Sequence, residues 1–429
     1  MNDRVIEVDA LARVEGEGAL YLRLRGNEIE KVEFRIFEPP RFFEAFMVGR
    51  DAHEAPDITA RICGICPIAY VMGACHAIEM SQGYTVTPEI RDLRRMLYCG
   101  EWIQSHTLHA TMLHAPDFLG LHDSFQIAQR EPEIVKNALR LKKLGNSLME
   151  VIGGRAVHPV NTRVGGFYRA PDADKIKALI PELEWGASAA RDLALAFSKF
   201  DFPDDEGDYQ FVSMRHPDDY AITEGRIISN RGLDIDVTEF QDHFVEEHVE
   251  RSNALHGRMK DGSAYMVGPL ARYSNNFDQL TPACQDTARA AGMGPIERNP
   301  FKSILVRLVE VQYACEEAAR LARSYVPPEP SFVTVPAHAG TGHGITEAPR
   351  GICYHSYTVD DERRMLKARI VPPTSQNQPQ IEDDLLRVVT ASIDMDDADL
   401  KWRCEQTIRN YDPCISCATH FLKLTVERV

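Results

Sequence analysis

The chain has 429 residues, with 48 basic and 64 acidic side chains, a net charge of −16 and a pI near 5.4. Hydrophobic residues make up 44% and charged residues 26%, which is typical of folded globular proteins and excludes disordered, collagen-like and coiled-coil chains. The acidic balance disfavours nucleic acid as a partner. No apolar run is long enough for a membrane span, and the amino terminus lacks the apolar core of a signal peptide, so we expect a cytoplasmic protein.

The first forty residues predict an antiparallel β hairpin, because apolar and polar positions alternate on both sides of the turn dipeptide Gly26-Asn27. From Pro88 the apolar side chains recur at helical spacing as far as Ala115-Pro116. The same spacing predicts further helices over 132–152, 172–200 and 299–323. Short alternating runs and acidic loops predict a strand-containing insertion over 201–270.

These patterns predict an α+β, mainly helical fold, with a central helical bundle, an amino-terminal β hairpin and small β insertions. We expect one large unit spanning 1–429. Its expected parts are an amino-terminal β region and first cysteine loop (1–87), a helical bundle (88–200), a mixed insertion (201–270), helices with the second cysteine loop (271–420), and a tail (421–429).

Two C-x-x-C pairs, Cys63/Cys66 and Cys414/Cys417, are the main candidates for chemistry, because this spacing lets two thiolates reach one metal ion. The halves of a zinc ribbon usually lie about 15–20 residues apart. Here the pairs lie near opposite ends of the chain. The spacing alone leaves open a long-range structural zinc site, two unrelated thiol pairs, or a catalytic metal centre.

Other candidate motifs are weaker. Segment 338–344 (H-A-G-T-G-H-G) is rich in glycine but is not a dinucleotide fingerprint, and we expect it to be a flexible loop. His106, His109 and His114 lack an accompanying carboxylate pattern and are expected to be buried core residues. The remaining cysteines have no cluster spacing; they are Cys75, Cys99, Cys284, Cys315, Cys353 and Cys404.

The residues around both pairs resemble the metal-binding motifs of the nickel-iron hydrogenase large subunit. Within that family, the chain most resembles the soluble NAD(P)-linked, sulfhydrogenase-like branch (group 3). The motifs are R-I-C-G-I-C at 61–66 and D-P-C-I-S-C-A-T-H at 412–420. Three further segments agree in order along the chain: R-V-E-G at 13–16, G-G-R-A-V-H-P at 153–159, and E-A-P-R-G at 347–351. The resemblance implies the fold of that subunit.

It also implies a nickel-iron centre. Cys63 and Cys414 would be terminal nickel ligands, while Cys66 and Cys417 would bridge nickel to an iron that carries carbon monoxide and cyanide. Cys414 would also accept the proton released when dihydrogen is split, and Glu15 would be the first relay for that proton.

By the same resemblance, Arg350, Pro349 and Asp412 would form a canopy over the open coordination position. Thr374 would donate a hydrogen bond to a cyanide ligand of the iron. Ser105 stands where many members of the family place a canopy aspartate.

Glu44 and His420 would hold a second, magnesium-like ion that ties the carboxyl terminus to the core. Tyr70 stands where the family commonly has a histidine beside the bridging sulfur, and His158 belongs to the family's G-G-R-x-x-H-P segment. Members of the family commonly lose a tail after the terminal histidine, which here would be 421–429.

The function implied is reversible heterolytic oxidation of H2 to protons and electrons within a heteromultimer. Because the chain has neither an iron-sulfur cluster spacing nor a nucleotide fingerprint, electrons would pass through partners. These would be an iron-sulfur small subunit, docked around the cysteine loops and Glu15, and flavin (FAD) subunits that use NAD(P). Two alternatives are a non-catalytic, respiratory-complex-type subunit of the same fold and a structural zinc protein.

Overall fold

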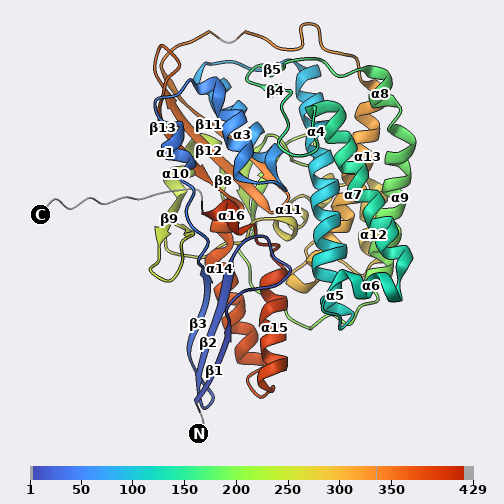
Figure 1. Cartoon of the computed structure of the whole chain (residues 1–429), viewed down its shortest axis with the longest axis vertical. Helices are drawn as coiled ribbons and strands as arrows, with labels where there is room; N and C mark the ends of the chain where they lie inside the picture. Colours follow the sequence, from blue (N-terminus) through green and yellow to red (C-terminus); the bar gives the residue numbers. More distant parts are fainter. Residues whose placement is uncertain (1–2, 335, 420–429) are drawn as a thin grey trace, which may run out of the picture.

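The computed structural model describes residues 3–334 and 336–419. Long helices stand side by side in one half of the molecule, and β sheets with shorter helices form the other half (Figure 1). The helices are α1 (Phe43–Met47), α2 (Ala55–Thr59), α3 (Pro67–Ser81), α4 (Pro88–Thr107), α5 (Ala115–Phe118), α6 (Ser124–Arg130), α7 (Pro132–Gly153), α8 (Ala173–Lys177), α9 (Ile180–Phe197), α10 (Phe240–His243), α11 (Pro269–Asn276), α12 (Pro282–Ala290), α13 (Ser303–Ser324), α14 (Pro373–Ala391), α15 (Asp397–Arg409) and α16 (Ile415–Ala418).

The strands form small antiparallel sheets in the orders β1-β2-β3, β4-β5, β6-β7-β8, β10-β9 and β11-β12-β13. Their bounds are β1 (Asp3–Val8), β2 (Gly18–Arg25), β3 (Glu28–Ile36), β4 (Thr162–Arg163), β5 (Gly166–Phe167), β6 (Val212–Arg215), β7 (Arg226–Ser229), β8 (Asp234–Ile235), β9 (Phe244–His248), β10 (Leu255–Met259), β11 (Gly340–Ala348), β12 (Gly351–Val359) and β13 (Met365–Val371).

The predicted amino-terminal hairpin is confirmed as β2 and β3, joined at Gly26-Asn27. The alternation seen in the sequence buries Leu20, Leu22 and Leu24 on one face, as expected for a half-buried sheet. The structure adds β1, which pairs with β2 and completes a three-stranded sheet. The strands expected within 201–270 are also present, as β6 to β10.

The helical bundle consists of α4, α7, α9 and α13, which pack against one another. As predicted, α4 begins at Pro88, where the side chain of Thr87 caps it. It ends earlier than predicted, because a π-helical turn over Leu108–His114 follows it before α5. The single helix predicted over 172–200 is two helices, α8 and α9.

Residues 340–344 of the glycine-rich segment that we expected to be a flexible loop belong to strand β11, so that expectation was wrong. Gly340, Gly342 and Gly344 face the backbone of α3, and a Cβ atom on Gly342 would lie 1.9 Å from the carbonyl oxygen of Ala77. The glycines therefore serve close packing of a strand on a helix. This contact joins α3, which follows the first cysteine pair, to β11.

Within the described residues, no helix is both long and apolar enough to cross a membrane. The tail at 421–429 lies outside the described residues, as does His420. The division of the chain into the parts expected from the sequence stays a prediction.

We predict that Gly342→Ala will lower the free energy of unfolding by about 1–3 kcal/mol, because the added methyl group must push β11 away from α3. Thermal or denaturant unfolding measures the loss. Gly294→Ala is the matched control. Apart from the adjacent residues, the atom nearest to its new Cβ atom would be the Ile296 carbonyl oxygen, at 3.7 Å, which is an ordinary contact. Equal effects of the two changes would contradict the packing account.

Candidate metal centre

Four cysteine side chains from the two ends of the chain meet in one buried cluster. The Sγ atoms of Cys63 and Cys414 are 3.5 Å apart, and those of Cys66 and Cys417 are 3.6 Å apart, although each pair is separated by 351 residues. All four Sγ atoms lie within 4.8 Å of one another, and no more than 3% of any of these residues is exposed. This is a ligand set for a soft or borderline metal.

Local structure aims each thiol at the cluster. Cys63 follows a 3-10 turn, Ala60–Ile62, and its Sγ accepts hydrogen bonds from the backbone N–H groups of Ile65 and Cys66. Cys66 is the N-cap of α3, which Pro67 begins. Cys66 therefore sits at the positive end of a 15-residue helix.

Arg41 ties the two cysteine loops together, although no local sequence pattern indicates this role. Its Nη2 atom donates to the carbonyl oxygen of Ile62 at 2.6 Å and also to that of Ser416. Its backbone N–H donates to the carbonyl oxygen of Thr419 at 2.8 Å. One side chain thus fixes the distance between loops that are remote in sequence.

The pKa values of the buried thiols indicate that the cluster needs a bound cation. Burial raises the pKa of Cys414 well above its usual range, and the adjacent thiols add to this effect. Although burial opposes it, hydrogen bonds from Cys414 and Cys417 hold the pKa of Cys63 well below its usual range. Four thiolates cannot share one small buried volume without a cation, so the donor set fits a metal centre.

Glu15 lies beside Cys414, as the sequence motif suggested. Its backbone pairs with the second cysteine loop, where Ile415 N–H donates to the Glu15 carbonyl oxygen at 3.0 Å. The Cys414 thiol donates to Glu15 Oε2 at 3.1 Å, and Ser416 donates to the same carboxylate through its N–H and its hydroxyl. Glu15 is only partly buried, so it lies between the thiol and the surface.

Arg350 and Asp412 form a buried ion pair beside the cluster. The guanidinium donates to Asp412 Oδ1 at 3.0 Å and to the Asp412 carbonyl oxygen at 2.6 Å. Arg350 Nη1 and Asp412 Oδ2 have no partner among the described residues. Ser105 Oγ is likewise buried without a partner, so Asp412 is the carboxylate that holds Arg350.

Arg272, on α11, clamps the turn that carries Arg350. Pro349 and Arg350 form the two-residue turn between β11 and β12, and Arg272 donates to the carbonyl oxygens of Ala348 at 2.6 Å and Pro349 at 3.0 Å. The Arg272 guanidinium lies 4.4 Å from the centre of the Trp102 ring. The sequence analysis missed Arg272, because a single arginine in a short helix carries no local signal.

Two carboxylates balance Arg272. Glu310 accepts bonds of 2.8 and 2.9 Å from it, and although burial opposes this, Arg272 holds the pKa of Glu310 at about 2. Glu347 accepts a third bond at 3.0 Å, but burial raises its pKa to about 7. All three residues are fully buried, so each charge depends on the others.

A second pair of residues missed by the sequence analysis supports the first cysteine loop from α4. Glu101, fully buried, accepts from the N–H groups of Ile68 and Ala69 at the start of α3, at 2.6 and 3.3 Å. Gln104 donates to the Ile65 carbonyl oxygen at 2.5 Å. The sequence analysis missed both residues because it predicted this helix from its apolar side chains alone.

Other residues from the sequence motifs also lie near the cluster. The hydroxyl oxygen of Thr374 accepts from the Cys414 N–H at 2.9 Å. Tyr70 is buried with its hydroxyl unpartnered among the described residues, and its ring packs edge-on against His355. His158 Nδ1 bonds the Ala60 carbonyl oxygen at 2.7 Å, beside the first cysteine loop.

The second-ion site is described only in part. Glu44, in α1, accepts a hydrogen bond from the Ile370 N–H at 2.6 Å, which holds this carboxylate against β13. Its expected co-ligand His420 lies outside the described residues.

The three histidines expected in the core are buried, which confirms that prediction. His106 bonds Glu310 at 3.0 Å, and His109 bonds the Arg409 carbonyl oxygen at 2.8 Å. Burial lowers the pKa of His106 to about 4 and holds the pKa values of His109 and His114 well below their usual range. They are neutral packing residues near pH 7.

Comparison with known proteins agrees with this geometry. The sequence profile "Nickel-dependent hydrogenase" matches residues 41–137 and 259–420. The sulfhydrogenase 1 alpha subunit of Pyrococcus furiosus is 32% identical over 98% of both chains, and the sulfhydrogenase 2 alpha subunit of that organism is 31% identical over 98% of this chain and 100% of its own length. The chain therefore belongs to the nickel-dependent hydrogenase family.

A more distant relative is the NAD-reducing hydrogenase HoxS subunit beta of Cupriavidus necator, 26% identical over 98% of this chain and 95% of that subunit. Among solved structures, an NAD+-reducing [NiFe]-hydrogenase in the H2-reduced state matches with a TM-score of 0.85 and 24% identity, over 97% of this chain and 99% of that chain. A [NiFeSe]-hydrogenase from Dm. baculatum matches with a TM-score of 0.80. These matches confirm the predicted large-subunit fold.

We predict that Arg272→Met will lower the free energy of unfolding by about 3–5 kcal/mol, because it leaves Glu310 and Glu347 buried beside an apolar side chain. Arg226→Met is the control, since Arg226 pairs with Asp234 at 2.6 Å where both side chains are more than half exposed. The control should lose no more than about 1 kcal/mol in the same unfolding assay. Similar losses for both variants would contradict the clamp.

Proposed function

We propose that this chain is the catalytic large subunit of a nickel-iron hydrogenase, which oxidises H2 reversibly to protons and electrons. The observation that carries the proposal is the four-thiol cluster with Glu15 on one side and the Arg350–Asp412 pair on the other. A structural zinc site needs neither a carboxylate hydrogen-bonded to one of its thiols nor a buried guanidinium with an unpartnered nitrogen.

Cys63 and Cys414 would be the terminal nickel ligands, and Cys66 and Cys417 would hold nickel and iron together. The four Sγ atoms lie within 4.8 Å of one another, and their division into terminal and bridging ligands follows from the sequence motifs. When bound, the two metals, with carbon monoxide and cyanide on the iron, supply the redox-active position at which H2 is split.

The protein's own part is to take up and remove a proton. Cys414 Sγ accepts the proton, and Glu15 Oε2, 3.1 Å away, receives it next. The Ser416 N–H and hydroxyl groups hold the Glu15 carboxylate in place and stabilise its negative charge. Because Glu15 is partly buried, the proton moves from the thiol toward the surface in one side-chain step.

Arg350 orients and shields the site without exchanging protons itself. Asp412 fixes the guanidinium, and Nη1, which has no partner in the part of the chain that the structure describes, is available to a substrate or ligand. Thr374 accepts from the Cys414 N–H, and its own hydroxyl proton can be donated to a cyanide of the iron. Glu44 and His420 would hold a magnesium-like ion.

Electrons would leave through an iron-sulfur subunit and flavin subunits that reduce NAD(P). The proposed docking surface consists of Phe42, Phe46 and Val48 around α1, with Val157 and Val160 of the His158 loop. Each of them is 40–55% exposed. The hydrogen bond from His158 to Ala60 places the His158 loop beside the Cys63 loop. Phe46 and the exposed Arg61 both line a hollow of about 380 Å³. This hollow gives the surface a concave shape that a partner subunit can recognise.

We predict that Cys417→Ser will lose nickel and iron together with H2 turnover, because a bridging thiolate binds both metals. Elemental analysis of the purified protein measures the metals. Cys404→Ser, a buried cysteine in α15, is the control and should keep both. Full hydrogen turnover by Cys417→Ser would show that the bridging role is wrong.

We predict that Glu15→Gln will slow exchange between H2 and deuterated solvent by about 100-fold or more, since an amide keeps the shape but cannot carry the proton. The metal content should stay unchanged. Glu17→Gln, an exposed acid in the same segment, is the matched control. An unaltered exchange rate in Glu15→Gln would point to another proton path.

We predict that Phe46→Glu will weaken association with the iron-sulfur subunit by about 2 kcal/mol, or ~30-fold, because it puts a charge at an apolar contact. Co-purification of the complex measures the loss. Phe125→Glu, at an even more exposed phenylalanine on α6, should assemble normally. Docking at another face would leave both variants fully assembled.

A further inference from the structure

Arg307, on α13, is a buried arginine with two guanidinium nitrogens that have no partner among the described residues. Its relative exposure is 1%, yet Nε and Nη1 have no hydrogen-bond partner in the described part of the chain, and no ion pair there includes it. Burial lowers its pKa to about 10, against the opposing fields of Asp412 and Glu310. A buried cation in this state is costly and requires a counter-charge.

The neighbouring carboxylates are already committed to other guanidiniums. Glu310 and Glu347 both bond Arg272, and Asp412 bonds Arg350. Among these three buried arginines, Arg307 is the one left without an ion pair in the described residues. Asp412 Oδ2 has no partner among the described residues, but this one carboxylate acts on both Arg350 and Arg307 and cannot balance both positive charges.

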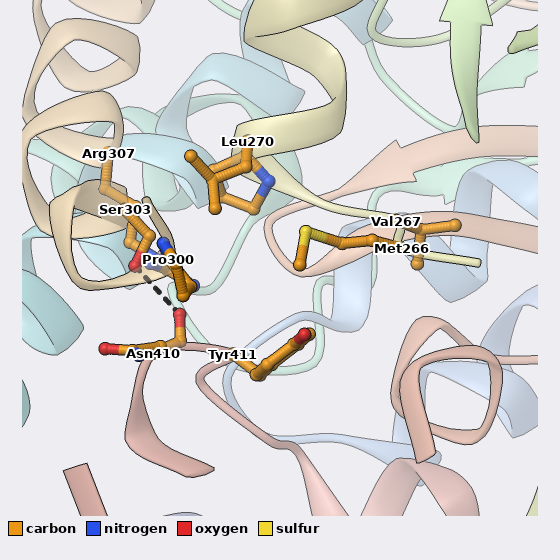
Figure 2. A pocket seen from close by; sticks show the side chains of 9 residues that line it. Met266, Val267, Leu270, Pro300, Ser303, Arg307, Asn410 and Tyr411 are labelled. Carbon is orange, nitrogen blue, oxygen red and sulfur yellow. Dashed lines mark hydrogen bonds between the residues drawn. The ribbon is translucent and has the colours of Figure 1, made fainter. Parts of the chain in front are cut away.

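A small internal cavity lies beside Arg307. Two of its lining residues, Asn410 and Tyr411, come just before the second cysteine loop in the sequence. In Figure 2, Arg307 and Leu270 lie above the cavity, Asn410 and Tyr411 lie below it, and Met266 lies to the right. It leaves about 10 Å³ for the centre of a water-sized particle, which is room for about one. The other lining residues are mostly apolar; they are Val267, Pro269, Pro300 and Ser303.

The polar groups of the lining favour an anion over water. Ser303 Oγ donates to the Asn410 carbonyl oxygen at 2.9 Å, and Tyr411 Oη donates to Asp384 at 2.6 Å. The Met266 and Val267 carbonyl oxygens already accept hydrogen bonds. Asn410 Nδ2 and Oδ1, which also line the cavity, have no partner among the described residues. Nδ2 is therefore a further donor beside Arg307, while Oδ1 is a single acceptor for a water proton. An anion needs donors alone and brings a negative charge to Arg307, which a water does not.

We propose that this cavity binds a small monovalent anion of halide size, held by Arg307 Nε and Nη1. The anion supplies the charge that Arg307 lacks, so Arg307 does not compete with Arg350 for Asp412. The site lies apart from the four thiols and does not depend on the hydrogen chemistry proposed above. The probe is bromide, which replaces chloride and scatters X-rays anomalously.

Crystals of the purified holo-complex grown in bromide should show an anomalous peak within hydrogen-bonding distance of Arg307 Nε or Nη1. A peak at this place that is missing from crystals of Arg307→Met supports the proposal. Ordered water without an anomalous peak at Arg307 overturns it, as do peaks found only on the surface, which would be adventitious ions only. The wild-type experiment decides even if the variant fails to fold.

Stability gives a second test. At constant ionic strength, replacing a bulky organic anion with chloride should raise the melting temperature of the wild-type complex until the site saturates. Arg307→Met should lose this shift, while Arg226→Met should keep it. The same chloride response in Arg307→Met and the wild type would overturn the proposal.

Discussion

The structure depends on holding two cysteine loops from opposite ends of the chain within sulfur contact of each other. Four buried thiols repel one another as soon as they ionise, so the loops need ties that do not rely on the thiols. Arg41 bonds carbonyl groups of both loops, and Glu15 bonds the second loop through backbone and side chain. The loops are therefore aligned by contacts next to the cluster, and bound metal adds to a site that the fold has shaped.

A second constraint is the burial of several charges around Arg350. The turn at Pro349-Arg350 is fixed by Arg272, and Arg272 is fixed by Glu310 and Glu347. Such networks cost desolvation energy, which their ion pairs and hydrogen bonds must offset. The benefit is a guanidinium held in one position by Asp412, with one nitrogen that has no partner among the described residues.

Much of this could be predicted from local sequence. The hairpin at Gly26-Asn27 and the helix beginning at Pro88 follow from periodicity and turn chemistry, which act over a few residues. Cys63 and Cys414 stand in motifs specific enough to indicate the family without any structure. Glu15 also depended on its motif, since a lone acid in a loop carries no such information.

The rest depends on contacts between remote parts of the chain. Arg41, Arg272 and Glu101 act through partners that no local pattern indicates. The glycines of β11 were misjudged because the reason for them lies in the backbone of α3. A glycine-rich segment looks the same in sequence whether it is a loop or a strand packed against a helix.

The central claim is that the four thiols hold nickel and iron in a hydrogenase centre. Infrared spectroscopy of the purified protein tests it most directly, because metal-bound carbon monoxide and cyanide absorb where protein groups do not. The account predicts bands from both ligands, together with nickel and iron in equal amounts, and their loss in Cys417→Ser. A protein that contains zinc alone and shows no such bands would contradict it.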